Sequence, residues 1–389
     1  MKAVVLHPGR DRSVRRRHPW LLSGAIARVE DEPAAGETVA VRSAEGETLA
    51  HGHFEPGSQI RVRLLAFGKE PEDEGALALR VAAAVARRGA DPLLAGTDAL
   101  RLVNAEGDGL PGLVVDRYAG VLVVRPSTSG MLRRGEAIAG ALREATGAAA
   151  ALLRPDAVSL RRAGVDARDG TLWGEAPAAP VAIAERGRRF RVDVRQGQKT
   201  GFYLDQRDAR DLVATLAAGR RVLDAFAYTG GFAVAALQGG AAHVELIETS
   251  RSALALAREH VAFARERAAC RADNAFEVLH AGVDDFDLVI LDPPPLARRK
   301  DDVKPAARAY KDLMLHAFGG ASRGRLVLAF ACSHHVGPEL FGKIAFGAAL
   351  DAGRRVSVLR ELCAPSDHPV ALDHPEGRYL TGLLLRVDG

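Results

Sequence analysis

A carboxylate and a thiol stand just beyond two apolar segments of the chain, and both are residue types that can do covalent and acid–base chemistry. Asp292 opens the run Asp-Pro-Pro-Pro directly after Phe286–Leu291, and Cys332 follows Arg325–Phe330. Prolines stiffen a turn and cannot continue a strand ladder, so they would hold Asp292 at the end of its strand. A thiolate is an effective nucleophile where nearby positive charge lowers its pKa, and two histidines follow Cys332 closely. The pattern predicts a nucleophilic cysteine that shares a pocket with a carboxylate.

A lone cysteine is more commonly a small buried side chain, and that interpretation is preferred for Cys270 and Cys363. Cys332 differs because it ends an apolar run. If its strand neighbours the strand before Asp292, the two strand ends lie about 5 Å apart. Ligands of open α/β sheets bind at the carboxyl ends of the strands.

A second group of polar residues follows earlier strands of the same region. The segment from Asp224 to Gly231 reads Asp-Ala-Phe-Ala-Tyr-Thr-Gly-Gly, a tight turn that lacks the G-x-G-x-x-G pattern of nicotinamide enzymes. An acidic strand end suits a ligand with an ammonium group, such as methionine, and suits a pyrophosphate badly. Glu248, at the end of the next strand, can accept both hydroxyls of a ribose. Asp273 and Asn274 can bond an adenine amino group or cap a helix.

The string from Gln198 to Arg207 is dense in polar groups and precedes the first of these strands. It has two interpretations: a segment that closes over a cofactor, or a capped helix entrance at Asp205 or Asp208.

The elements that must position these residues lie in 181–389. Apolar β runs alternate there with alanine-rich helical stretches, which predicts a parallel sheet covered on both faces. The last two β runs, Arg355–Leu362 and Tyr379–Val387, are expected to pair antiparallel at an edge across a short loop.

Two further modules precede this region. Residues 1–70 contain three short β runs at 37–43, 48–54 and 60–65, and an arginine cluster that ends in His18-Pro-Trp20. Basic groups beside an aromatic ring suit a phosphate backbone, although a solvated charged face explains the cluster equally well. A polar connector from Gly68 to Gly75 leads to an α+β module at 76–175, with helices at 76–88 and 132–146.

The composition narrows the class of protein. The chain has 389 residues, enough for two or three domains. Its three cysteines are far apart, which excludes a disulfide framework and a cysteine zinc site, and no metal is expected. The pI of about 9.1 comes mainly from arginine. No apolar run spans a bilayer and no cleavable leader is evident, so we expect a cytoplasmic protein without membrane contact.

Nearly the whole chain resembles the bacterial large-subunit ribosomal RNA cytosine-C5 methyltransferases of the large subunit methyltransferase I type. Arg16–Gly24 and Gly52–Ile60 look like the N-terminal PUA domain of that family, an RNA-binding β-barrel. Its catalytic motifs and C-terminal motifs are matched by Gln198–Arg207, Phe226–Gly231, Asp292-Pro-Pro, Cys332-Ser, Asp367-His-Pro and Pro375–Leu380.

The resemblance implies a Rossmann-like class I methyltransferase domain after a small β-barrel PUA domain and the α+β middle module. It implies S-adenosylmethionine as cofactor and Cys332 and Asp292 as catalytic residues. The cofactor-binding residues would be Lys199, Tyr203, Arg207, Asp224, Phe226, Thr229, Gly230, Glu248, Asp273, Asn274 and Asp292. The RNA-binding residues would be Arg15, Arg16, Arg17 and Trp20.

The sequence departs from the family at three places. Pro295 stands where relatives often have lysine, and Asn274 where an acidic residue is usual. No second cysteine follows Asp-Pro-Pro, as it does in many other RNA cytosine-C5 methyltransferases, so enzyme release must proceed without that thiol.

The implied reaction adds the Cys332 thiolate to C6 of a cytosine in large-subunit ribosomal RNA, which makes C5 nucleophilic. The target base must leave any stack, so single-stranded or loop RNA is expected. The main rival is an RNA methyltransferase that acts on an exocyclic base nitrogen, but such enzymes usually place an aromatic residue next to Asp-Pro-Pro, and here Pro295 and Leu296 follow. A small-molecule methyltransferase and a non-catalytic RNA-binding factor are weaker alternatives. A homodimer is left open.

Overall fold

The computed structural model describes residues 1–70, 72–297, 299–320 and 324–389. Residue 71, inside the expected connector from Gly68 to Gly75, lies outside the described residues. The chain forms two compact units, and each is assembled from separate stretches. The first consists of Met1–Gly187, Val192–Leu204 and Ser366–Gly377, and the second of Arg188–Arg191, Asp205–Pro365 and Arg378–Gly389.

The first unit begins with a six-stranded sheet in the order β2-β6-β5-β4-β1-β3. Its elements are β1 (Ala3–Leu6), α1 (Arg12–Arg15), β2 (Trp20–Leu22), β3 (Ile26–Glu30), β4 (Thr38–Arg42), β5 (Thr48–Phe54) and β6 (Ile60–Phe67). Side chains such as Val4, Val39 and Leu64 are buried in its core. The three expected β runs correspond to β4, β5 and β6.

A five-stranded sheet in the order β11-β10-β9-β8-β7 follows. Its elements are α2 (Glu74–Gly89), β7 (Ala99–Asn104), β8 (Leu113–Tyr118), β9 (Val121–Pro126), α3 (Ser129–Arg133), α4 (Gly135–Thr146), β10 (Ala150–Leu153), α5 (Ala157–Arg162) and β11 (Gly170–Trp173). The Asp73 side chain caps α2. The single helix expected over 132–146 was wrong, because Arg134 leaves the helical conformation (ψ 18°) and separates α3 from α4.

The second unit is built on a seven-stranded sheet in the order β16-β15-β14-β17-β18-β20-β19. Its strands are β14 (Arg221–Ala225), β15 (His243–Ile247), β16 (Ala268–Arg271), β17 (Leu288–Leu291), β18 (Leu326–Cys332), β19 (Val356–Leu362) and β20 (Leu380–Val387). The first five run parallel, and β20 is antiparallel to both β18 and β19. The strand order reverses at β14, which has β15 on one side and β17 on the other, so a ligand site is expected at the carboxyl end of β14.

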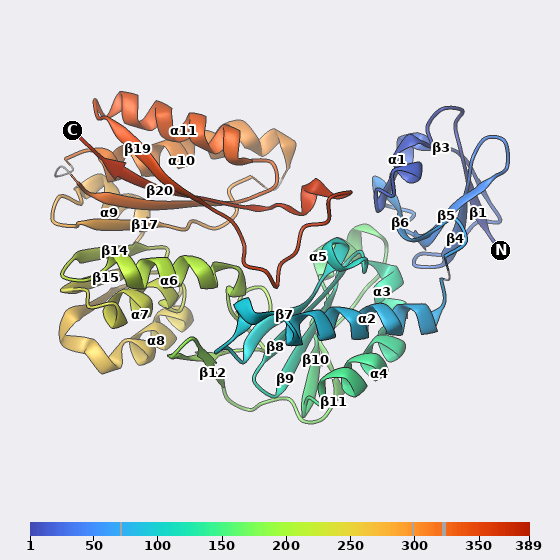
Figure 1. The fold of residues 1–389 in the computed structure, drawn as a ribbon, viewed down its shortest axis with the longest axis horizontal. Helices are drawn as coiled ribbons and strands as arrows, with labels where there is room; N and C mark the ends of the chain where they lie inside the picture. Colours follow the sequence, from blue (N-terminus) through green and yellow to red (C-terminus); the bar gives the residue numbers. More distant parts are fainter. Residues whose placement is uncertain (71, 298, 321–323) are drawn as a thin grey trace. The chain divides into compact units, whose positions relative to one another are not determined.

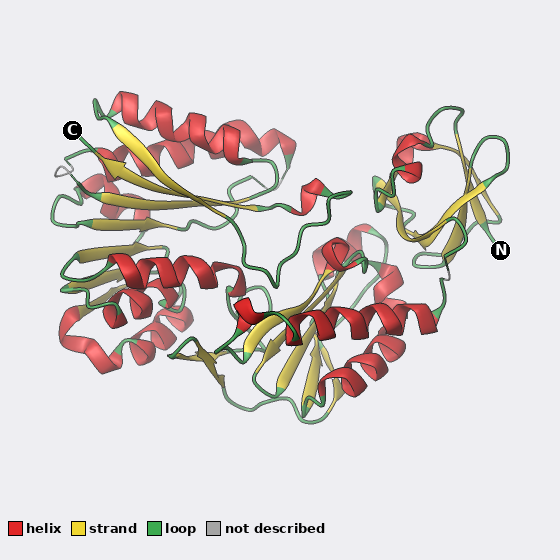
Figure 2. Cartoon of the chain, viewed as in Figure 1, coloured by secondary structure: helices red, strands yellow, loops and turns green. Residues whose placement is uncertain are grey.

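Helices cover both faces of this sheet (Figures 1 and 2). They are α6 (Arg207–Leu216), α7 (Gly231–Gln238), α8 (Arg251–His260), α9 (Ala275–Ala281), α10 (Val303–Phe318) and α11 (Pro338–Asp351). Leu223 and Ala225 alternate along β14 and share a buried cluster with side chains of α9, α10 and α11. This is the doubly wound α/β fold expected from the sequence. In addition, β12 (Val181–Glu185) and β13 (Arg188–Val192) form a two-stranded sheet.

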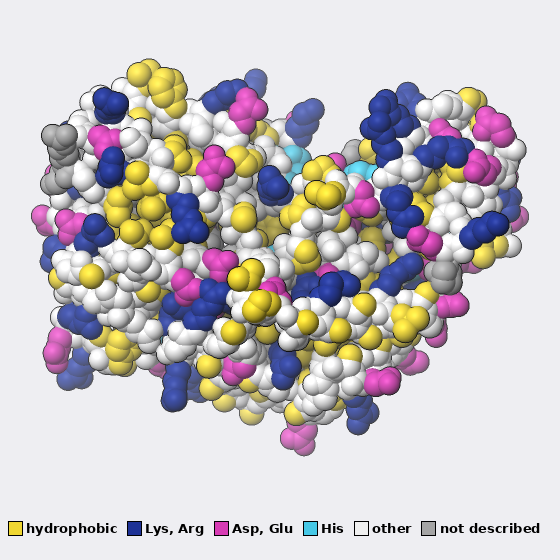
Figure 3. Space-filling model, in the orientation of Figure 1, with side chains coloured by type: hydrophobic (Ala, Val, Ile, Leu, Met, Phe, Trp, Pro, Cys, Tyr) yellow, Lys and Arg dark blue, Asp and Glu magenta, His cyan; other side chains and the backbone are white. Residues whose placement is uncertain are grey.

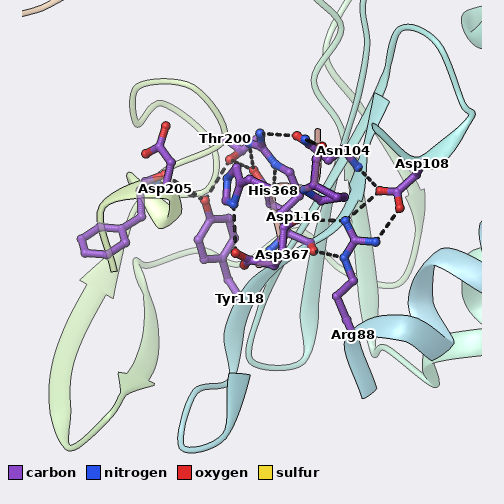
Figure 4. Close-up of polar contacts among 12 residues, drawn as sticks. Arg88, Asn104, Asp108, Asp116, Tyr118, Thr200, Asp205, Asp367 and His368 are labelled. Carbon is purple, nitrogen blue, oxygen red and sulfur yellow. Dashed lines mark hydrogen bonds and ion pairs between the residues drawn. The ribbon is translucent and has the colours of Figure 1, made fainter. Parts of the chain in front are cut away.

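The last two strands pair as expected, but the short loop expected between them was wrong. Residues 363–379 connect β19 to β20, and Ser366–Gly377 of this stretch belong to the first unit. A buried polar network holds it there (Figure 4). The backbone N–H of Arg101 donates to the Asp367 carboxylate (3.0 Å), and Arg88 donates to the Asp367 carbonyl (2.8 Å). Arg88 is also paired through two bonds with Asp108 (2.6 and 2.7 Å).

The same network holds the Gln198–Leu204 stretch within the first unit. The Thr200 hydroxyl donates to the Asp116 carboxylate at 2.5 Å and lies 2.8 Å from the Tyr118 hydroxyl. All three side chains are buried. Charged or hydroxyl side chains of the middle module thus bind both Val192–Leu204 and Ser366–Gly377. Each of these two segments is followed directly in the chain by residues of the second unit.

Candidate active site

Asp292 and Cys332 lie side by side at the carboxyl edge of the large sheet. Asp292 directly follows β17, Cys332 is the last residue of β18, and the two strands are parallel neighbours. Cys332 Sγ lies 3.8 Å from Asp292 Oδ1, so the thiol donates to the carboxylate. Two neighbouring parallel strands thus place a nucleophilic residue against a proton acceptor.

Two further side chains lie near this pair and were not singled out from the sequence. Gln206, which is buried, donates from Nε2 to Asp292 Oδ2 at 3.0 Å. Tyr310 projects from α10 and is 1% exposed. Burial raises the pKa of the Tyr310 hydroxyl, and the charges of Cys332 and Asp292 raise it further. Gln206 was within reach of sequence reasoning, because it lies in the polar string 198–207. Tyr310 was not, because one aromatic residue on a helical pattern carries no signal.

Asp224 is the penultimate residue of β14 and is fully buried. Its Oδ2 accepts the backbone N–H of Ala233 at 3.0 Å, whereas no described residue bonds its Oδ1. Burial raises the pKa of this carboxyl to about 8; the Ala233 bond opposes the shift, and the negative charges of Asp292 and Glu248 add to it. A buried carboxylate oxygen without a partner, close to two more carboxylates, is suited to a cationic ligand.

The loop after β14 is held in an unusual backbone conformation. Phe226 (φ 69°), Tyr228 (φ 49°) and Gly230 (φ 77°) all occupy the left-handed region, which is uncommon for residues other than glycine. Glu248 accepts the backbone N–H of Tyr228 at 2.8 Å and thereby ties this loop to the end of β15. A second oxygen of Glu248 accepts the N–H of Ser250 at 2.7 Å.

His260, a residue that the sequence did not suggest, binds the backbone of the loop after β14. Its Nδ1 lies 2.8 Å from the Thr229 carbonyl, and its Nε2 lies 2.8 Å from the backbone N of Arg191. Nδ1 must carry the proton and Nε2 must accept, so the ring is neutral. Burial, the largest influence, lowers the pKa of His260. The imidazole therefore joins the Thr-Gly-Gly turn to β13.

Asp273 and Asn274 follow β16, as expected, and both have local partners. Asp273 is paired with Arg271 at 2.7 Å. Asn274 caps α9 by accepting the N–H of Phe276 at 2.9 Å. The ring of Phe276 meets that of Phe226 edge to face, with centroids 5.7 Å apart. An aromatic pair thus lies beside the strand end where an adenine was expected.

The remaining expected cofactor residues fall in different units. Lys199 and Tyr203 belong to the first unit, where the Lys199 ammonium lies 4.3 Å from the centre of the Tyr203 ring. Arg207 begins α6 in the second unit and is fully buried.

Three of the four expected RNA-binding residues, Arg15, Arg17 and Trp20, have protein partners. Arg15 is paired with Asp11 (2.6 Å) and Glu47 (2.5 Å), and Arg17 with Glu70 (2.6 Å). Arg16 is exposed. In Figure 3, basic side chains gather with acidic ones on the N-terminal domain. Trp20 faces the protein: its Nε1 donates to Glu106 at 2.7 Å, and its ring centroid lies 4.4 Å from that of His374.

Comparison with known proteins agrees with this fold. The family model of S-adenosylmethionine-dependent methyltransferases matches residues 107–345, and the model of PUA-like domains matches residues 4–67. A solved chain of Streptococcus mutans, assigned as a SAM-dependent methyltransferase, superposes with a TM-score of 0.84 at 21% identity, and all of both chains is covered. The chain is a SAM-dependent methyltransferase with an N-terminal PUA-like domain.

Curated relatives define the family more closely. Ribosomal RNA large subunit methyltransferase I of Escherichia coli O139:H28 is 37% identical over 391 aligned positions, and that of Serratia proteamaculans is 38% identical over 397; both alignments cover 99% of each chain. The chain belongs to this family of methyltransferases. None of the helices formed by the described residues is long and apolar enough to span a membrane.

Proposed function

We propose that this methyltransferase modifies C5 of a cytosine in large-subunit ribosomal RNA through a covalent bond between Cys332 and C6 of the base. The relatives named above and the PUA-like domain support an RNA substrate. The observation that carries the C5 assignment is the thiol of Cys332, 3.8 Å from the Asp292 carboxylate at the ligand-binding edge of the sheet.

The second unit has groups that fit S-adenosylmethionine. The Oδ1 of Asp224, buried and without a partner among the described residues, would receive the ammonium group. Glu248 would accept the ribose hydroxyls, and Phe226 and Phe276 would flank the adenine. The positive φ of Gly230 lets the turn pass close to the ligand. When bound, the cofactor supplies a methyl group that a sulfonium makes electrophilic.

The protein's own groups would act in a simple order. Asp292 Oδ1 takes the proton of the Cys332 thiol, and the thiolate forms a bond to C6 of the cytosine. The electron pair of the C5–C6 double bond moves into the ring toward N3, where the protonated Asp292 donates a hydrogen bond and stabilises the charge. C5, now enamine-like, attacks the methyl group. Solvent water takes the C5 proton, which restores the double bond and expels the thiolate, and Asp292 returns its proton to the Cys332 sulfur.

The basic N-terminal domain would hold the RNA through its phosphates. Arg15 and Arg17 are already paired with carboxylates, so RNA would have to compete with those ion pairs, whereas Arg16 is exposed. Contacts to phosphates position an RNA without reading its sequence, and they weaken as salt rises. Selection of the base is therefore assigned to the second unit.

Methylation of an exocyclic base nitrogen is the alternative, because it also employs an Asp-Pro-Pro turn. It has no need of a thiol, so replacement of Cys332 separates the two reactions. We expect Cys332→Ala to abolish methyl transfer to RNA while S-adenosylmethionine still binds in equilibrium dialysis. Cys363→Ala is the matched control, since Cys363 is exposed.

The assay follows labelled methyl groups into protein-free large-subunit ribosomal RNA, with bisulfite sequencing to locate the modified base. Methylation by Cys332→Ala at the wild-type rate would rule out the covalent mechanism. Methylation that appears at no cytosine would rule out the substrate.

A further inference from the structure

Gln206 presents a buried hydrogen-bond acceptor beside the reactive pair. The side chain is 1% exposed, and its Nε2 donates to Asp292 Oδ2 at 3.0 Å. Its Oε1 is buried, and no group of the described residues bonds it. Leaving a buried amide oxygen without a donor is unfavourable, so such an atom calls for a ligand.

The orientation of this amide is fixed by its partner. A glutamine amide carries both a donor and an acceptor, and a freely rotating one could bond either cytosine or uracil. A carboxylate oxygen only accepts, so Asp292 selects the orientation in which Nε2 faces it. The group left for a ligand is then the acceptor Oε1, attached to the same carbon as Nε2.

The acceptor distinguishes the two pyrimidines. Cytosine has an amino group at C4, which donates, whereas uracil has a carbonyl oxygen at C4, which accepts. A base whose C6 lies at Cys332 and whose N3 lies at Asp292 turns its C4 substituent toward the neighbours of Asp292. There Oε1 would accept from a cytosine amino group and would repel a uracil oxygen.

We propose that Gln206 is the residue that makes this enzyme specific for cytosine over uracil, with Asp292 locking its amide. The inference rests on the proposed reaction at Cys332. The carboxylate thereby has two separate roles on its two oxygens: Oδ1 serves the thiol and Oδ2 fixes the amide that reads the base.

The test compares covalent capture by two RNA probes. Large-subunit ribosomal RNA is transcribed with 5-fluorocytidine in place of cytidine, or with 5-fluorouridine in place of uridine. Fluorine at C5 cannot leave as a proton does, so the thiol adduct persists in detergent. The wild-type enzyme with S-adenosylmethionine should form an adduct with the first RNA and little or none with the second.

Gln206→Leu removes the acceptor at nearly constant volume. The ratio of the capture rate on the 5-fluorocytidine probe to that on the 5-fluorouridine probe should fall about tenfold or more. The variant loses the buried hydrogen bond to the cytosine amino group and also the repulsion of the uracil oxygen. Gln238→Leu makes the same change on an exposed position of α7 and should keep the wild-type ratio. Binding of S-adenosylmethionine shows that the variants are folded, and Gln206→Met replaces Gln206→Leu if the latter does not bind it.

A folded Gln206 variant that is slower on both probes but keeps the wild-type ratio would overturn the proposal, because Gln206 would then only support Asp292. Failure of the wild-type enzyme to form any adduct with the 5-fluorocytidine RNA would instead refute the proposed function.

Discussion

Asp224→Asn tests the electrostatics of the site, because it removes an ionisable group whose charged form the fold disfavours. The wild-type carboxyl has a pKa of about 8 in the folded protein against an ordinary value of 3.8. Between these two values the folded protein holds a proton that the unfolded chain has released. The free energy of unfolding therefore falls as the pH rises through this range, by up to about 1.4 kcal/mol per pH unit.

At pH 7 about three pH units of this range have been crossed, so the carboxyl costs the cofactor-free enzyme at most roughly 4 kcal/mol. Asparagine has no charge to desolvate, and its oxygen can still accept the N–H of Ala233. Asp224→Asn should therefore stabilise the second unit at pH 7 and leave it nearly unchanged near pH 4. For a unit of this size, 4 kcal/mol corresponds to a rise in melting temperature of roughly 10 °C.

Calorimetry at several pH values between 4 and 8 measures this difference, with the relevant transition identified as the one that S-adenosylmethionine raises. Asp285→Asn is the control, since Asp285 is exposed. The same substitution should weaken S-adenosylmethionine binding about 10- to 100-fold, the effect of losing a charged hydrogen bond. If wild type and Asp224→Asn keep a constant difference in stability across this pH range, the carboxyl does not hold a proton in the folded state and the reasoning fails.

Three more substitutions probe the supports of the site. His260→Phe should lower the stability measured for the SAM-sensitive transition in calorimetry by about 2–4 kcal/mol. The Thr229 carbonyl and the Arg191 backbone N–H would both lose their hydrogen-bond partner. Since the pKa of His260 is lowered, the wild type should lose stability as the pH falls below about 6.5, and this slope should be missing in the variant. Gly230→Ala should cost about 1–2 kcal/mol and weaken cofactor binding in equilibrium dialysis, because φ is 77° and a Cβ would approach that of Ala257 to 3.3 Å. Asp108→Asn should leave Arg88 buried without its counter-charge and lower the SAM-insensitive transition by about 3–5 kcal/mol; an unchanged transition would contradict the role given to this pair.

The sequence by itself determined the class of the fold and the edge at which chemistry occurs. Apolar runs alternating with helical stretches require a covered parallel sheet, and residues directly after such runs must lie at its carboxyl edge. That local rule was enough to bring Asp292 and Cys332 to one edge, and to place Asp224 and Glu248 at the ends of adjacent strands. The expectation of a SAM-dependent methyltransferase is confirmed by the family match.

Only the tertiary structure decided the contacts made between distant segments. The return of Ser366–Gly377 to the first unit depends on Arg88 and Arg101, more than 260 positions earlier in the chain, and no periodicity encodes such a pairing. His260 and Tyr310 lie on the helices α8 and α10. In the sequence, nothing distinguishes a helical residue with a functional contact from one that is simply buried. The amide of Gln206 likewise acquires a direction only when the carboxylate of Asp292 is beside it, because hydrogen bonds between side chains are set by distance in space and not by spacing in the chain.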